Sequence, residues 1–329
     1  MGREFTKDLK MKNIKKIYCL TPVYNDWESF AILLSNLEKL QSENTQEYKF
    51  SVVVVNDGST DEHLPLTNKT GIDITIVNLK INIGHQRAIA VGLQYIHNEI
   101  SDYDYVVVMD SDGEDKPEHI ISLLSKTNES SKEKIIFAQR NKRQESVGFK
   151  LGYYFYKKLF SYLTGQKISF GNFSIIPKGL LGKVVHQNNI WNHYSGGIIQ
   201  SKIPYDMVLL DRGKRYKGVS KMNFNSLILH GLSSIAVYFD QISIKILKLS
   251  LTGIVLCFLS VTYILVEKLF TDLAIPGWAS SLTLIISGII LQLFSVTLIV
   301  LLLQLSTRKN IVAPNTKIYL DFIENIENT

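Results

Sequence analysis

Two aspartates separated by one residue are the strongest candidates for chemistry in this 329-residue sequence. Asp110 and Asp112 directly follow the apolar run Val106–Met109, whose β-branched valines favour a strand that is buried on both faces. Two carboxylates this close repel each other unless a cation lies between them, and hard oxygen ligands suit Mg²⁺ or Mn²⁺. The alternative is an acidic turn through Asp112 and Gly113 that leads into a helix near Pro117. The pair alone does not decide between these two interpretations.

The aspartate pair falls within an alternation of strand and helix patterns. Strands are predicted at residues 15–25, 50–56, 73–79, 106–109 and 134–140, with shorter ones at 167–177 and 203–210. This alternation predicts an α/β fold with a doubly wound, mostly parallel sheet, whose strands bring their carboxyl ends to one ligand-binding edge. A polar turn is the alternative for each strand end alone, but several polar ends at one edge favour a binding site. The residues expected at that edge with the aspartate pair are Asn25, Asp26, Asp57 and Arg140.

Several common site patterns are missing from the sequence. It has no glycine-rich dinucleotide fingerprint, no P-loop, no His-Glu-x-x-His motif and no Gly-x-Ser-x-Gly elbow. Dinucleotide dehydrogenases and P-loop enzymes are therefore disfavoured. The two cysteines, Cys19 and Cys257, do not form a disulfide framework or a zinc pattern, which indicates a reducing compartment. His85 and His193 are interpreted as surface or packing residues, with a ligand contact as the alternative for His193.

Lysine and arginine give the chain a net charge of +6 and gather in separate groups. Arg140 and Arg143 lie in one group, and the glycine-containing segment 211–221 is another. The second group is either a solvated loop or a loop that folds over a diphosphate, because arginine forks and lysine charges suit phosphates. The aromatic and basic stretch 149–163 either packs on the sheet or lies against lipid headgroups. Separate groups fit phosphate ligands and an anionic membrane better than a nucleic acid, which is not an expected partner.

The C-terminal third has the pattern of a membrane anchor. Residues 223–247 are amphipathic, as expected of an interfacial helix, and residues 249–266 and 273–307 carry no charge. Two charge-free segments close to or above the ~20 residues of a spanning helix favour a transmembrane pair over a buried helical hairpin. The flanking Lys245, Lys248, Arg308 and Lys309 place both termini in the cytoplasm by the positive-inside rule. The expected divisions are an α/β domain at 1–222, an interfacial region at 223–248, a two-helix anchor of the inner cell membrane at 249–307, and a cytoplasmic tail at 308–329.

Five motifs, taken in their order and spacing, resemble those of the family 2 glycosyltransferases with a GT-A fold. They are TPVYND, VVVVNDGSTD, NIGHQRAIAVGL, MDSDGEDKPEHI and RNKRQES. The paired apolar helices and the motif RYKGVSKM resemble the polyprenyl-phosphate branch of that family, the relatives of dolichol-phosphate mannose synthase and of bactoprenol glucosyltransferases. The resemblance covers roughly residues 15–310. It implies a metal-dependent glycosyltransferase that uses Mg²⁺ or Mn²⁺.

The resemblance also implies roles for individual residues. Asp110 and Asp112 would hold the metal on the donor diphosphate, with Ser111 near the ribose or the sugar. Asp57 would hydrogen-bond the base, and Arg140 would lie near the sugar or the incoming phosphate. The nucleotide pocket would be lined by Pro22, Tyr24, Asn25 and Asp26. The residues expected to bind phosphates or the acceptor are Arg143, Arg212, Arg215, Ser220 and Lys221.

Three positions depart from the family pattern. Asp26 stands where the family usually has Glu, Asn56 replaces the first acid of Asp-Asp-Gly-Ser, and Asn172 stands where many relatives have Asp. The last departure puts an acceptor-side carboxylate at that position in doubt. Glu114 and Asp115 are either charges at the start of a helix or candidates for a general base.

The expected reaction moves a sugar, with inversion, from a nucleoside-diphosphate sugar, preferentially a UDP-sugar, to a polyprenyl phosphate. A lipid phosphate is already anionic and needs no strong base, whereas a lipid hydroxyl or a saccharide, the alternative acceptors, would need one. A non-catalytic scaffold that binds nucleotide-sugar is the alternative from another class. Two membrane spans without a charged residue inside them do not favour a transporter. The sequence is compatible with a homo-oligomer and with a separate flippase. It does not identify the sugar or the pathway.

Overall fold

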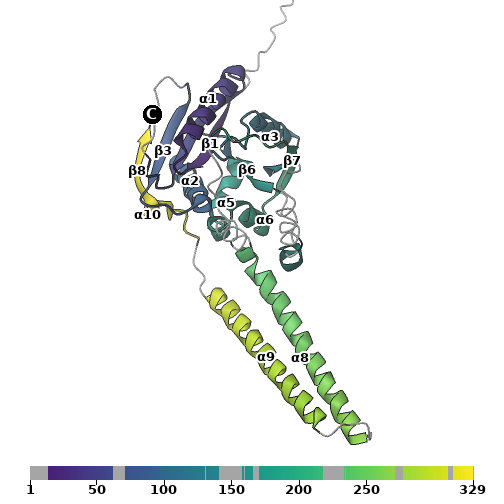
Figure 1. Ribbon diagram of the computed structural model, residues 1–329. Coiled ribbons are helices and arrows are strands. Elements are labelled where there is room, and N and C mark those ends of the chain that lie inside the picture. Colours follow the sequence, from purple (N-terminus) through teal and green to yellow (C-terminus); the bar gives the residue numbers. More distant parts are fainter. Residues whose placement is uncertain are drawn as a thin grey trace, which may run out of the picture. The chain divides into compact units, whose positions relative to one another are not determined.

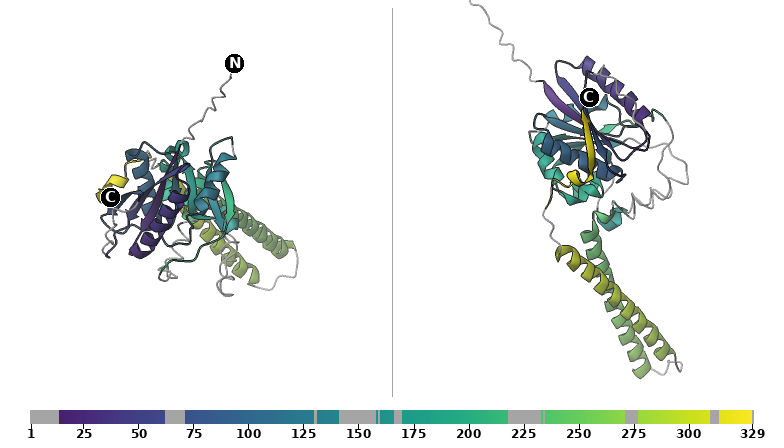
Figure 2. Two further views of the ribbon diagram at one scale, coloured as in Figure 1. Left: turned by 90° about the horizontal axis from the view of Figure 1, so that it is seen from above. Right: turned by 90° about the vertical axis from the view of Figure 1, so that its left-hand side faces the viewer.

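The computed structural model describes residues 14–61, 71–129, 131–140, 160–165, 170–217, 235–270, 277–309 and 314–328, together with the single positions 158 and 233. The chain divides into two compact units (Figures 1 and 2). The first contains residues 1–146, 168–237 and 314–329, and the second contains residues 147–167 and 238–313. The polypeptide therefore passes from the first unit to the second and back again twice.

The first unit is built on a mixed, mostly parallel sheet, which confirms the predicted α/β fold. Its described strands lie in the order β7-β5-β6-β4-β1-β2-β3-β8. Their bounds are β1 Lys15–Val23, β2 Tyr48–Asn56, β3 Asp73–Leu79, β4 Tyr105–Val108, β5 Ile135–Arg140, β6 Phe170–Pro177, β7 Tyr205–Leu210 and β8 Ile323–Asn328. Strand β1 pairs in parallel with β2 and β4, β2 with β3, and β5 with β7. The carboxyl ends of these parallel strands therefore share one edge.

Helices cover both faces of this sheet because its strands are apolar on both sides. Val53 and Val55 of β2 belong to a core with α2, α5 and α6, whereas Val52 and Val54 belong to a core with α1 and α3. The helices of this unit are α1 Trp27–Glu43, α2 His85–Glu99, α3 His119–Asn128, α5 Lys178–Val185, the 3-10 turn η1 Asn188–Trp191, α6 Tyr194–Gln200 and α10 Tyr319–Phe322. The sheet is thus doubly wound, with a packed core on each face.

Strand β6 was expected from the sequence, but its place in the sheet was not. It runs antiparallel between β4 and β5, pairing with both. The strand that carries Arg140 is therefore not a neighbour of the strand that leads to Asp110. Instead, β6 brings Asn172 beside the end of β4, because Val108 faces Ser174 in the antiparallel register.

The predicted tail at residues 308–329 is wrong for its described C-terminal part. Strand β8 pairs antiparallel with β3 and forms an edge of the sheet (Figure 1), and α10 packs Tyr319, which is 1% exposed, against α2. Phe322 and Ile323 also pack against the same core. Their burial, and the backbone hydrogen bonds that β3 would otherwise lack on this side, stabilise the segment in the sheet.

The second unit contains two long apolar helices, as predicted. They are α8 Phe239–Phe270 and α9 Trp278–Lys309, and both are long and apolar enough to cross a membrane. They pack against each other: Gly253 leaves room for Leu293, and the Gln304 amide donates to Asp240 at 2.7 Å.

The predicted division at residue 248 is not a helix boundary, because α8 continues through it. At about 1.5 Å per residue, a 32-residue helix is longer than the ~30 Å hydrocarbon layer, so its polar first turns can extend beyond that layer. Most of the expected helix over 149–163 lies outside the described residues, as does the first part of the expected helix over 223–247. Phe160 is described, and its ring packs on Tyr238 in this unit.

Candidate active site

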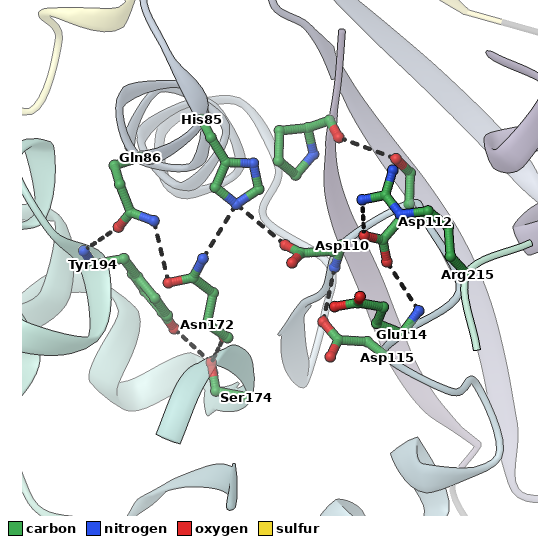
Figure 3. Close-up of polar contacts among 12 residues, drawn as sticks. His85, Gln86, Asp110, Asp112, Glu114, Asp115, Asn172, Ser174, Tyr194 and Arg215 are labelled. Atoms are coloured by element: carbon green, nitrogen blue, oxygen red, sulfur yellow. Dashed lines mark hydrogen bonds and ion pairs between the residues drawn. The ribbon is translucent and has the colours of Figure 1, made fainter. Parts of the chain in front are cut away.

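The aspartate pair lies in a tight turn directly after β4, at the carboxyl edge of the sheet (Figure 3). Asp115 accepts a hydrogen bond from the Asp110 backbone N–H at 3.0 Å, and Asp112 accepts one from Glu114 N–H at 2.9 Å. Gly113 has a φ of 91°, a conformation that glycine adopts at little cost. Ser111 donates to the Pro22 carbonyl at 3.5 Å. The acidic turn and the carboxylate site are therefore the same feature: the turn sets the direction of both carboxylates.

His85, at the start of α2, contacts the first of these carboxylates. Its Nε2 lies 3.1 Å from Asp110 Oδ1 and 3.1 Å from the Asn172 amide nitrogen. The His85 side chain is 43% exposed, and its partial desolvation opposes the charged imidazole, but the Asp110 carboxylate, with Asp57 and Asp112 behind it, outweighs that cost and raises the pKa of His85. The sequence-based interpretation of His85 as a surface or packing residue therefore missed this contact. The available signal was its position just after β3, at the edge where the other polar residues meet.

A second layer of polar side chains holds His85 and Asn172 in place (Figure 3). Gln86 donates to Asn172 Oδ1 at 3.3 Å and accepts from the Tyr194 backbone N–H at 2.6 Å. The Tyr194 hydroxyl lies 2.8 Å from Ser174 Oγ on β6. Asn172 is thus an amide whose polar atoms contact His85 and Gln86.

The basic segment after β7 lies over the aspartate turn. Arg215 contacts Asp112 at 2.6 Å and Asp26 at 3.9 Å, and Arg212 forms an ion pair with Glu114. The Tyr216 backbone N–H donates to the Asp112 carbonyl at 2.8 Å, and its ring lies so close to Gly113 that an added Cβ would be 2.7 Å away. Arg212 and Arg215, predicted to bind phosphate, are therefore beside the predicted metal ligands.

The remaining predicted residues divide into described and undescribed positions. Arg140 is the last residue of β5, but its side chain lies outside the described structure, as do Arg143, Ser220 and Lys221. Tyr24 is exposed and Pro22 is buried beside it at the end of β1. Of the predicted phosphate-binding residues, the structure thus positions the side chains of Arg212 and Arg215.

Asp57 and Asn25 hold together the loops at the far side of this edge. Asp57, 3% exposed, accepts from the backbone N–H groups of Ile83 and Gly84 at 2.8 and 3.0 Å. Its burial raises the pKa of the carboxyl, and these two N–H groups oppose the rise. Asn25 has a φ of 49° and accepts from the Thr60 N–H at 2.8 Å. Both residues are integral to the loop framework, and their predicted contacts with a nucleotide remain predictions.

The donor atoms of Asp110 and Asp112 fit a hard divalent ion. Both are carboxylates, and their side chains are 24% and 12% exposed, so they are accessible from the edge of the sheet. Within the described residues, no group of three or more His, Cys, Asp or Glu side chains is arranged to hold a metal by itself. An ion at this pair would therefore need further ligands from beyond the described carboxyl, thiol and imidazole groups, and phosphate oxygens are suitable ligands.

Comparison with known proteins identifies relatives of this chain. The family model for "Glycosyl transferase family 2" matches residues 18–184. The uncharacterized glycosyltransferase YkcC of Bacillus subtilis is 27% identical over 292 residues, covering 84% of this chain and 85% of the relative. The undecaprenyl-phosphate 4-deoxy-4-formamido-L-arabinose transferase of Yersinia enterocolitica is 31% identical over 140 residues, covering 41% of this chain and 40% of that protein. A similar solved structure, glucosyl-3-phosphoglycerate synthase from Mycobacterium tuberculosis, has a TM-score of 0.46 and 13% identity, covering 69% of this chain and 80% of that one.

Proposed function

The chain belongs to glycosyl transferase family 2, and from that premise we propose that it transfers a sugar from a nucleoside-diphosphate sugar to a polyprenyl phosphate at a membrane. The observation that carries this proposal is the meeting of the acidic turn with the basic segment at the carboxyl edge of the sheet, where Arg215 pairs with Asp112 and Arg212 pairs with Glu114. Carboxylates that suit a divalent ion, next to arginines, form a site for a diphosphate.

The chemistry of the proposed reaction is the departure of a diphosphate. The phosphate oxygen of the acceptor forms a bond to the anomeric carbon, the bond from that carbon to the diphosphate oxygen breaks, and the nucleoside diphosphate leaves from the opposite face. Asp110 and Asp112 would hold Mg²⁺ or Mn²⁺, which when bound supplies a Lewis acid for the leaving diphosphate. Arg215 and Arg212 add positive charge beside the same position, and such fixed charge is usually the largest contribution to catalysis.

The polar contacts favour an acceptor that is already anionic. Glu114 is engaged with Arg212, and Asp115 accepts the backbone N–H of Asp110, so both candidates for a general base serve the turn itself. Asn172 is an amide and cannot accept a proton at neutral pH. A lipid phosphate needs no base, whereas a lipid hydroxyl or a saccharide would. The Yersinia relative, named as an undecaprenyl-phosphate transferase, supports the same acceptor class.

The path of the chain supports a membrane location for this reaction. Strands β7 and β8 belong to one sheet, and the two apolar helices α8 and α9 lie between them in the sequence. If both helices cross a membrane, the chain returns to the side from which it entered. Strands β7 and β8 are then on the same side of the membrane, as their place in one sheet requires. The positive residues at the outer ends favour the cytoplasm as that side. A flippase would then be needed to move the product across.

The proposal is tested with the full chain in lipid nanodiscs, a panel of labelled nucleotide sugars and undecaprenyl phosphate. Asp112→Asn is expected to lower kcat by about 100-fold or more, because it weakens the electrostatic stabilisation of the leaving group. Asp73→Asn, at the amino end of β3 in an exposed pair with Lys49, is the matched control.

The product should release its sugar in mild acid, as a glycosyl phosphate does. Full activity of Asp112→Asn, or activity undiminished by a chelator, would contradict the metal site, and turnover without a labelled lipid would favour another acceptor. Tight binding of nucleotide sugars without turnover of any of them would favour the scaffold.

A further inference from the structure

Three asparagines form a row across strands β2, β3 and β8. Asn56 is directly opposite Asn78, and Asn78 is directly opposite Asn325. The Asn56 amide donates to Asn78 Oδ1 at 2.8 Å, and the Asn78 amide donates to Asn325 Oδ1 and to Glu327 Oε1, each at 2.6 Å. Asn78 is 8% exposed, so its polar atoms depend on these partners.

The row continues into the loops of the candidate active site. Asn56 Oδ1 accepts from the Ser59 backbone N–H at 3.0 Å, and Ser59 Oγ accepts from the Asn25 backbone N–H at 3.0 Å. These loops also contain Asp57, whose carboxylate holds the backbone before His85. An unbroken series of hydrogen bonds therefore joins the C-terminal strand to the ends of β1 and β2.

The same C-terminal segment also holds the helix that begins with His85. Gln94 of α2 is fully buried, and its amide donates to the Asn315 carbonyl at 3.0 Å and accepts from the Tyr319 N–H at 3.2 Å. Asn98 donates to the Thr316 carbonyl at 2.8 Å. The described partners of the Gln94 amide are therefore supplied by residues more than 200 positions later in the chain.

We propose that residues 314–328 are a positioning element of the donor-binding site, acting through the asparagine row on the loop Asp57–Thr60 and through Gln94 on α2. This inference rests on the proposed function, because it assigns the loop to the nucleotide end of the donor. The element lies after both apolar helices in the sequence, so the site is complete only when the chain has passed through them and returned.

The direction of the hydrogen bonds explains the amide at position 56. Asn78 uses its N–H groups on Asn325 and Glu327 and leaves its carbonyl oxygen for a donor. An amide at position 56 supplies that donor, whereas a carboxylate would place an acceptor against an acceptor. The departure from the Asp-Asp-Gly-Ser pattern is thus matched to the strand that pairs with β3. Asn56 and Asn78 are positioning residues, because they reach the donor only through the loop.

The test reverses the polarity of the row in the full chain in nanodiscs. Asn78→Asp keeps the acceptor for Asn56 but removes the donors to Asn325 and Glu327 and faces the Glu327 carboxylate. We expect it to weaken binding of UDP with Mn²⁺ by about tenfold, equivalent to roughly 1.4 kcal/mol. Glu327→Gln alone should change the affinity by less than about twofold, because its carbonyl oxygen still accepts from Asn78. The double variant should regain affinity to within about threefold of the native protein, since the amide introduced on β8 can donate to the carboxylate introduced on β3, as a coupling between contacting residues requires.

A matched control and a second measurement separate positioning from general destabilisation. Thr75→Val removes the 3.0 Å hydrogen bond from Thr75 to Asn328, which joins the same two strands away from the row, and should leave UDP affinity unchanged. Hydrogen exchange should accelerate at the backbone amides of 57–60 in Asn78→Asp, relative to those of α3, and slow again in the double variant.

The outcomes distinguish this inference from the proposed function. Unchanged exchange at 57–60 in Asn78→Asp, no rescue by Glu327→Gln, or an equal loss of affinity in Thr75→Val would overturn the inference. If the native protein binds no nucleoside diphosphate while exchange at 57–60 still follows the asparagine row, the proposed function fails and the connection from β8 to the loop stands.

Discussion

Asp115 provides the most direct test of how the aspartate turn works. It is 3% exposed, and its Oδ2 accepts the Asp110 backbone N–H at 3.0 Å. Asp115→Ala would leave that N–H without its carboxylate acceptor, which costs about 2 kcal/mol for a hydrogen bond to a charged group. At about 2–4 °C per kcal/mol for a domain of this size, the melting temperature should fall by roughly 4–8 °C. Asp115→Asn keeps a carbonyl oxygen that can accept from the same N–H, so it should lose less than about 1 kcal/mol.

The kinetic comparison of these two variants separates a structural role from a general base. If Asp115 supports the turn, Asp115→Asn should retain kcat within about threefold, while Asp115→Ala should lose about tenfold, the equivalent of roughly 1.4 kcal/mol. If Asp115 is the base, both variants should lose at least about 100-fold in kcat, because neither can accept a proton. The assay is transfer to undecaprenyl phosphate together with thermal unfolding in nanodiscs, with Glu118→Gln, at an exposed position directly before α3, as the control. An inactive Asp115→Asn with an unchanged melting temperature would refute the structural role.

Two further predictions concern the arginine segment and the response to pH. Gly113→Ala should raise the KM for the donor by about tenfold or more. The added Cβ would lie 2.7 Å from the Tyr216 ring, and the φ of 91° at this position adds backbone strain of about 1–2 kcal/mol. A native KM in Gly113→Ala would show that donor binding does not need the Tyr216 ring against residue 113. Burial lowers the pKa of His97, with help from His186, and lowers the pKa of His119, with help from Lys116. Because each of these two histidines binds fewer protons in the folded state than in the unfolded state, their contribution to the free energy of unfolding should fall as the pH drops below about 6.5, whereas the raised pKa of His85 acts in the opposite direction. The change in the free energy of unfolding between about pH 7.5 and about pH 5.5, measured by chemical denaturation, should include a smaller loss in His97→Gln than in the native protein. An equal loss in both proteins would contradict the role of His97 in this pH dependence.

The sequence alone predicted the parts of this protein that depend on local pattern. Alternating strand and helix patterns indicated the doubly wound sheet, because apolar periodicity reports which faces are buried. The position of Asp110 and Asp112 at the carboxyl edge followed from that topology. The two apolar helices followed from length and lack of charge, which need no knowledge of their surroundings.

Only the tertiary structure decided which distant segments meet. It placed β6 between β4 and β5, brought His85 to Asp110 and Asn172 to His85, and returned β8 to the edge of β3. None of these contacts can be predicted from a periodic pattern in the sequence, because each joins segments whose separation along the chain is unrelated to their distance in space. Strand β8 is short and carries several polar residues, so its sequence resembles that of a solvated tail. Its place in the sheet becomes evident only when Asn78 and Gln94 are seen with the partners they require.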